Sequence, residues 1–138
     1  MANHLIIDLK QRAIRPGTAF EGDILWDLET APRALRLRLG WWTSGRGDRD
    51  EHVVAEREWA SPAAIGKESF SLAVPEAVVP SFSGRLISVE WGLQLSARGI
   101  RLDDEIESVI VSPLLREIDI SAETYESQGK SVPFGKGR

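Results

Sequence analysis

The side chains that are able to do chemistry are few in this sequence, and histidine and cysteine are the scarcest. The chain has two histidines and no cysteine, which removes thiol catalysis, disulfides and cysteine metal ligands together. His4 lies near the start of the chain and His52 lies beside a loop, and the two are too far apart for a metal-ligand spacing. The sequence therefore predicts no metal site, no cofactor and no histidine-based catalysis.

A short run of carboxylates is the second feature with chemical potential. Asp103, Asp104 and Glu105 are consecutive, and Glu107 follows two residues later. Several such oxygens suit a calcium ion or the acid and base of a small hydrolase. The run lacks the glycine and the regular oxygen spacing of a calcium loop, so we expect a charged turn that leads into a strand. A hydrolase that uses Asp103, Glu105 and Glu107 stays open as an alternative function.

Two short segments match known motifs in spelling alone. Residues 124–131 differ by one residue from a phosphate-binding loop, and Arg46-Gly47-Asp48 spells a tripeptide of extracellular adhesion ligands. A phosphate-binding loop needs a parallel strand before it and a helix after it, and residues 132–138 leave no room for that helix. We interpret the first match as a coincidence and the second as the turn of a hairpin.

Binding is the chemistry that remains. In residues 35–42 the side chains of Arg36, Arg38 and Trp42 fall on the opposite face from the leucines. An outward-facing aromatic ring beside arginines is typical of a surface that contacts another molecule. The competing interpretation is a solvated face whose charges are neutralised by the neighbouring strand. Arg36, Arg38 and Trp42 are the candidate partner-binding residues.

Apolar and polar residues alternate along most of the chain, which indicates that the side chains above are carried by β-strands. The pattern predicts seven strands, at residues 5–9, 20–28, 35–42, 53–59, 70–74, 87–95 and 105–111. Gly and Pro turns separate them, and no segment of similar length has helical spacing. Seven strands without crossover helices indicate an all-β, antiparallel sandwich. Its core is expected to contain Trp26, Trp41, Trp59 and Trp91, whereas Trp42 faces outward.

The third and fourth predicted strands flank a loop at residues 44–50 and are expected to pair as a hairpin. A centre near Gly47 puts opposite charges face to face on the outer side and apolar groups face to face on the inner side. The predicted pairs are Arg38 with Glu56, Arg36 with Glu58, Leu39 with Ala55 and Leu35 with Trp59. Alternation also places Val53 on the inner side. Each exposed charge pair is worth about 0.2–1 kcal/mol, so these pairs help to fix the register more than the stability.

Two stretches of the sequence combine prolines and a glycine with a predicted strand. Residues 15–26 read Arg-Pro-Gly-Thr-Ala-Phe-Glu-Gly-Asp-Ile-Leu-Trp, and residues 70–75 and 79–95 combine Val-Pro, Pro-Ser and Gly84 with a long strand that has Trp91 midway. Together they resemble the arrestin family, including its single-domain bacterial and sporulation-control relatives. The resemblance covers residues 4–113, and Thr18 stands where the family has an acidic residue. It implies an immunoglobulin-like β-sandwich that serves as an adaptor or scaffold.

The resemblance also sets limits. Arrestins proper carry two sandwiches, whereas 138 residues suffice for one domain that buries about two-thirds of its unfolded surface. A homodimer that imitates the two-domain arrangement therefore stays open, and no phosphate-sensing residue is carried over. We predict that residues 1–113 form the sandwich. Residues 114–138, which are increasingly polar, form a C-terminal extension that is partly ordered or docks on a neighbour.

Charge and hydropathy narrow the function further. A net charge of −4 and a pI near 5.2 argue against a non-specific nucleic-acid partner. The chain has no stretch of about 18 apolar residues and no export signal, so we expect a cytoplasmic protein without a transmembrane segment. The predicted function is a non-enzymatic protein-protein interaction module that docks a partner by the Arg36, Arg38 and Trp42 face or by an exposed sheet edge. The alternative is a carbohydrate-binding sandwich whose outward tryptophans stack on sugars.

Overall fold

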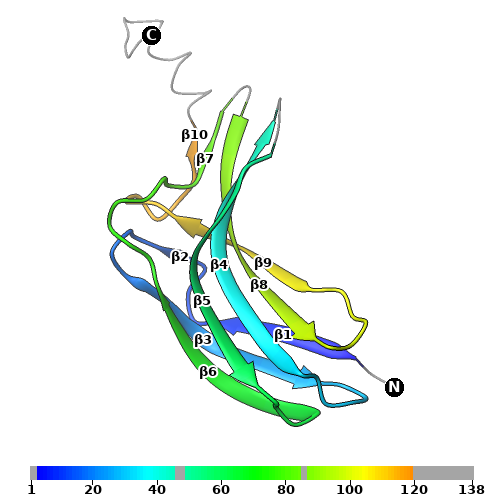
Figure 1. The fold of residues 1–138 in the computed structure, drawn as a ribbon. Coiled ribbons are helices and arrows are strands. Elements are labelled where there is room, and N and C mark those ends of the chain that lie inside the picture. The colour runs from blue at the N-terminus through cyan, green and yellow to red at the C-terminus, as the bar shows by residue number, and fades with distance from the viewer. Residues whose placement is uncertain (1–2, 46–48, 85–86, 120–138) are drawn as a thin grey trace, which may run out of the picture.

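The computed structural model describes residues 3–45, 49–84 and 87–119, which form an all-β fold without a helix (Figure 1). Seven strands of six residues or more lie in these ranges: β1 (His4–Leu9), β3 (Ala19–Asp27), β4 (Ala34–Gly45), β5 (Glu51–Ala60), β6 (Ile65–Ala73), β8 (Ile87–Arg98) and β9 (Glu105–Val111). They correspond to the seven predicted strands. Three strands of two residues were not predicted: β2 (Ala13–Ile14), β7 (Phe82–Ser83) and β10 (Ile118–Asp119). A pair of residues is too short to show alternation.

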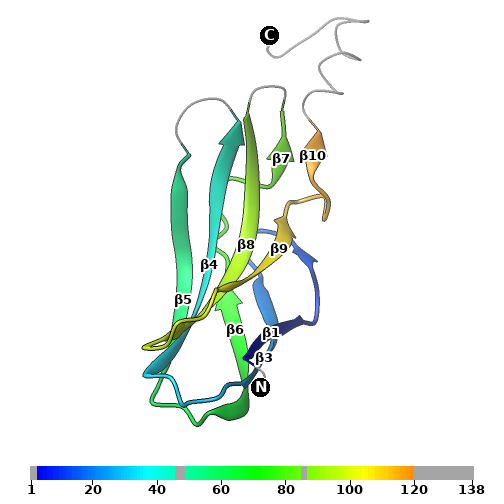
Figure 2. The ribbon, with the colours of Figure 1, turned by 90° about the vertical axis from the view of Figure 1, so that its right-hand side faces the viewer.

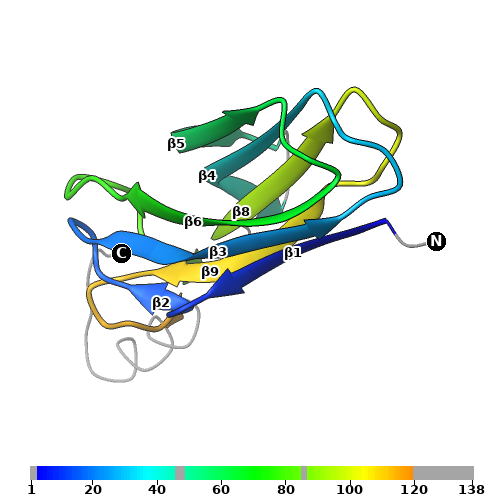
Figure 3. The same ribbon diagram turned by 90° about the horizontal axis from the view of Figure 1, so that it is seen from below.

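The strands form two sheets that face each other, which Figure 3 shows from below. The smaller sheet has the order β1-β3-β6. The larger has the order β10-β7-β8-β4-β5, and β9 pairs with β8 and with β2. The long strands pair antiparallel, whereas β2 with β9 and β7 with β10 are parallel. The predicted antiparallel sandwich is confirmed.

The core lies between the two sheets, because each long strand turns every second side chain inward. The fully buried large residues include Phe20, Ile24, Leu35, Leu37, Leu39, Trp91, Leu93 and Leu95. Trp26 is also buried, and its indole nitrogen donates a hydrogen bond to the carbonyl oxygen of Ala63 (2.8 Å). Trp41 and Trp59 are partly buried and pack against this core. The predicted inward placement of these four tryptophans is confirmed.

The hairpin of β4 and β5 has the predicted register over its first half. The observed pairs are Leu35 with Trp59, Arg36 with Glu58, Arg38 with Glu56 and Leu39 with Ala55. The register then shifts, so that Gly40 faces Val53 and Val54 is the extra residue of a β-bulge. The predicted inward placement of Val53 is therefore wrong. Val53 is 55% exposed, while Val54 and Ala55 both pack against the core.

The larger sheet is the longer of the two along its strands (Figures 1 and 2). The ends of β4, β5 and β8 near Gly45, Glu51 and Ile87 rise past the smaller sheet. The outer face of β5, β4 and β8 points toward the viewer in the upper part of Figure 2, whereas in the lower part the end of β8 and the adjoining part of β9 cross in front of β4 and β5. This face is therefore uncovered in this view along the upper part of β4.

Several sequence-based predictions concern residues that the structure does not describe. Residues 46–48 of the hairpin loop, the motif match at residues 124–131 and the C-terminal extension from residue 120 onward all lie outside the described residues. Within the part of the chain that is described, no helix is long and apolar enough to cross a membrane.

Candidate functional site

Arg36, Arg38 and Trp42 lie on the outer face of β4, as the alternation predicted. All three are partly buried, because β5 and β8 flank β4 on both sides. They share a strand and a face, and yet their surroundings differ.

Arg36 is paired with carboxylates. Its Nε lies 3.8 Å from Oε2 of Glu56 and 3.9 Å from Oε1 of Glu58, both on β5. The register predicted one glutamate for each arginine, but both glutamates approach Arg36. Its charge is therefore compensated by the neighbouring strand, as in the interpretation of a neutralised face.

Arg38 turns the other way, toward β8. Its Nη2 donates a hydrogen bond to Oε1 of Gln94 (3.1 Å), and Nε2 of Gln94 donates to Oδ2 of Asp104 (2.6 Å). Among the described residues Arg38 forms no ion pair, and its buried Nε, like that of Arg36, has no hydrogen-bond partner. The arginine is thus held in place by a neutral amide while its charge stays uncompensated by direct contact.

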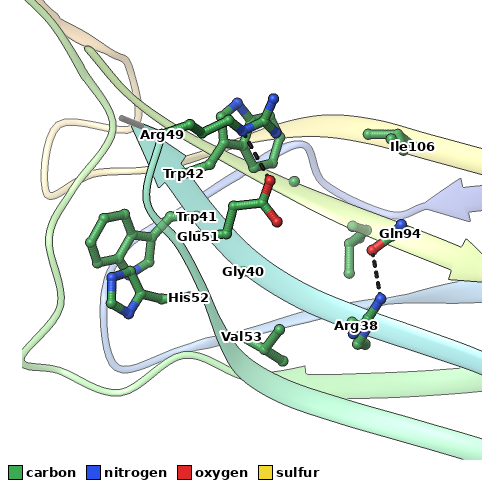
Figure 4. Close-up of a pocket in the computed structure, with 12 residues that line it drawn as sticks. Arg38, Gly40, Trp41, Trp42, Arg49, Glu51, His52, Val53, Gln94 and Ile106 are labelled. Atoms are coloured by element: carbon green, nitrogen blue, oxygen red, sulfur yellow. Dashed lines mark hydrogen bonds and ion pairs between the residues drawn. The ribbon is translucent and has the colours of Figure 1, made fainter. Parts of the chain in front are cut away.

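A hollow of about 280 Å³ opens beside Arg38 on this face (Figure 4). Its floor includes Gly40 of β4 and Gly92 of β8, which are directly paired. These two adjacent glycines leave the middle of the row without side chains. The ring of Trp42 lies over Gly92, since a Cβ atom at Gly92 would come within 2.7 Å of Cη2 of the ring. The shape of the hollow therefore depends on both glycines and on the indole.

The bulge explains the glycine on β4. A Cβ atom at Gly40 would overlap the carbonyl oxygen of His52, because the bulge brings the backbone of β5 close at this point. A glycine inside a strand is typical of such a close approach.

Aliphatic and charged groups complete the lining. Val53 of β5 and Ile106 of β9 are 55% and 57% exposed. The guanidinium of Arg49 lies 5.2 Å from the centre of the Trp42 ring, and its Nε forms an ion pair with Glu51 (3.0 Å). An aromatic wall, an aliphatic rim and one uncompensated cation are suited to binding a ligand with both a polar and an apolar part.

The carboxylates of residues 103–107 do not line this hollow. Asp103 and Asp104 lie in the connection before β9, as predicted. Asp104 supports Gln94, and Glu107 forms an ion pair with Arg12 (2.7 Å). In residues 3–45, 49–84 and 87–119, no group of three His, Asp or Glu side chains is placed to hold a metal ion.

The sequence reasoning found Arg38 and Trp42 but missed most of the lining. Gly40, Gly92, Gln94, Val53 and Ile106 come from four strands. The pairing of β4 with β5 was predicted, but the pairings of β8 with β4 and of β9 with β8 were not. The glycines inside two strands were the available signal, because such glycines mark bulges and close contacts.

Comparison with known proteins supports the fold. No family model matches the sequence, and a search of curated proteins finds no match. The structure is similar to the crystal structure of Spo0M, a sporulation control protein from Bacillus subtilis, with a TM-score of 0.59 and 15% sequence identity. The match covers 94% of this chain and 55% of that chain, so this chain spans about half of its length. At this identity the likeness concerns the fold alone, an all-β sandwich similar to that of Spo0M.

Proposed function

We propose that this chain is a non-enzymatic protein-protein interaction module of the arrestin-like type, which docks a partner protein on the outer face of β5, β4 and β8. The observation that carries the proposal is the hollow beside Arg38, with Trp42 as its wall. Spo0M, whose structure is similar, is a sporulation control protein, which supports a regulatory role of this kind. The arrestin-like family, a cytoplasmic location and a homodimer stay predictions from the sequence.

Arg38 and Trp42 are the residues on which we place the docking role. Buried tryptophan and arginine side chains contribute most of the free energy in many interfaces. Arg36 was predicted with them, but Glu56 and Glu58 already compensate its charge. Arg36 also lies outside the hollow. We therefore place Arg36 in the part of the face that stabilises the sheet.

A binding role fits the lining better than a catalytic one. The described residues that line the hollow supply no hydroxyl, thiol or amine nucleophile, and His52 stacks on Trp41 with ring centroids 4.2 Å apart. The carbohydrate-binding alternative has less support. Trp41 and Trp42 are neighbours in β4, so their side chains point to opposite faces and form no common platform for a sugar.

The test is capture of the partner by the full chain from the cell that produces it, followed by the mass of the complex in solution. Trp42→Ala is expected to weaken capture at least about tenfold, because truncating such an anchor costs about 2 kcal/mol or more. Arg36→Gln serves as the matched control on the same strand and should capture the partner as the natural chain does. Undiminished capture by Trp42→Ala would contradict the proposal.

A further inference from the structure

We infer that the hollow receives an extended acidic peptide, with one glutamate or aspartate carboxylate on Arg38 and an aliphatic side chain on each of Val53 and Ile106. This inference rests on the proposed function and adds the chemistry of the partner segment. Three observations carry it, namely the charge of Arg38, the total charge of the lining and the spacing of the two aliphatic residues.

The first observation is the state of Arg38. A guanidinium has five N–H donors, and among the described residues Arg38 uses one of them, toward Gln94. Arg36, two residues away, lies close to two carboxylates. A planar guanidinium matches a carboxylate in two parallel hydrogen bonds. Because Asp104 fixes Gln94 and Gln94 fixes Arg38, less side-chain entropy is lost when a carboxylate binds.

The second observation is the charge balance of the lining. Arg38 and Arg49 are cationic, Glu51 is anionic and His52 counts as neutral at pH 7, which leaves one positive charge. One carboxylate balances this charge. A phosphate monoester carries about −1.5 to −2 at this pH, and Asp104 lies just behind Gln94. The lining therefore favours a carboxylate over a phosphate.

The third observation is the position of the aliphatic rim. Val53 lies on β5 and Ile106 on β9, three strand spacings apart, and their register positions differ by two residues along the strands. This offset raises the separation from about 14 Å to about 16 Å. In an extended peptide the first, third and fifth side chains share one face over about 13 Å, and the length of the two outer aliphatic side chains covers the remainder. Arg38 reaches toward β8, so its guanidinium lies near the middle of this span (Figure 4).

The fitting motif thus has aliphatic residues at its first and fifth positions and an acidic residue at its third. Three acetylated and amidated peptides test it against the full chain by calorimetry. The first has the sequence Ser-Leu-Ser-Glu-Ser-Leu-Ser, and the other two have glutamine or phosphoserine in place of glutamate. The glutamate peptide is expected to bind at least about tenfold more tightly than the glutamine peptide, and more tightly than the phosphoserine peptide.

Two arginine variants show where the preference originates. Arg38→Gln is expected to bind the glutamate and glutamine peptides equally, whereas Arg36→Gln should keep the full preference. Each ratio is measured within one protein sample, so partial unfolding of a variant affects both peptides alike. Gly92→Ala, which displaces the Trp42 ring, should weaken both peptides together.

Equal binding of the glutamate and glutamine peptides by the natural chain, or a preference that survives Arg38→Gln, would overturn the inference. Tighter binding of the phosphoserine peptide would overturn it as well. If no peptide binds while capture of the partner still depends on Trp42, the inference fails and the proposed function stands. If capture is also independent of Trp42, both fail.

Discussion

The segment of β4 around Arg36 and the segment from Arg38 to Trp42 are adjacent in the strand. Their outer side chains lie on the same face of the sheet and are partly buried, yet these side chains have different neighbours. Around Arg36 the outer face is closed by two glutamates of β5. From Arg38 onward, the paired Gly40 and Gly92 leave a hollow and the cation lacks a carboxylate partner among the described residues. The absence of side chains at the two glycines thus shapes this face as much as the arginine and the tryptophan do.

The largest effect on stability is expected on the inner side of the closed segment. Leu37 is fully buried, so Leu37→Ala should lower the free energy of unfolding by about 2–5 kcal/mol in urea titrations. Leu37→Met keeps most of the volume and should cost less than about 1.5 kcal/mol. Similar losses for the two variants would mean that the core around Leu37 is loosely packed.

The next effect belongs to Gly40, the glycine of β4 within the segment from Arg38 to Trp42. Gly40→Ala should cost about 1–3 kcal/mol, because the new methyl group meets the backbone of β5 at the bulge. Gly92→Ala is the matched control, since its nearest contact is the Trp42 ring, which is able to rotate away. Denaturation midpoints rank the two variants. A milder effect at Gly40 than at Gly92 would contradict the close approach of the strands.

A smaller effect is expected for the group that positions the open segment. Asp104→Ala removes the hydrogen bond to Gln94 and should weaken glutamate-peptide binding by about 0.5–1.5 kcal/mol, with little change in stability. Asp103→Ala, at the neighbouring exposed residue, is the control. Calorimetry with the same peptide measures both, and equal affinities would show that Gln94 holds Arg38 without help.

The smallest effect is expected for Arg36→Gln. Its distances to Glu56 and Glu58 are long for an ion pair, and both glutamates are substantially exposed. The loss of unfolding free energy should stay below about 1 kcal/mol and shrink as salt is added. A loss of several kcal/mol that is independent of salt would show that Arg36 is structural in another way.

The sequence predicted the fold well because half-buried strands show their two faces as alternation. It missed the start of β6 at Ile65, where alternation is weak because Ile65 is exposed and Gly66 packs under Trp26. It also missed the bulge at Val54, since a single extra residue is not visible in a pattern of period two.

The candidate site was predicted in part, for a related reason. Arg38 and Trp42 lie on one strand, so alternation alone placed them outward. Gln94 and Ile106 join them only through the pairing of β4 with β8 and of β8 with β9. Such pairings link residues far apart in the chain, and composition and spacing within one segment carry no information about them.

The bulge has a consequence for the behaviour of the concentrated protein. β5 is the last strand of its sheet, so in the described part of the chain its outer row of backbone groups has no neighbour. Exposed rows of this kind template aggregation, and a bulge or charged side chains discourage it. The irregularity at Val54 bends this row, and Glu56 and Glu58 would repel a second copy aligned beside them. The bulge beside the hollow thereby protects the molecule from polymerising edge to edge.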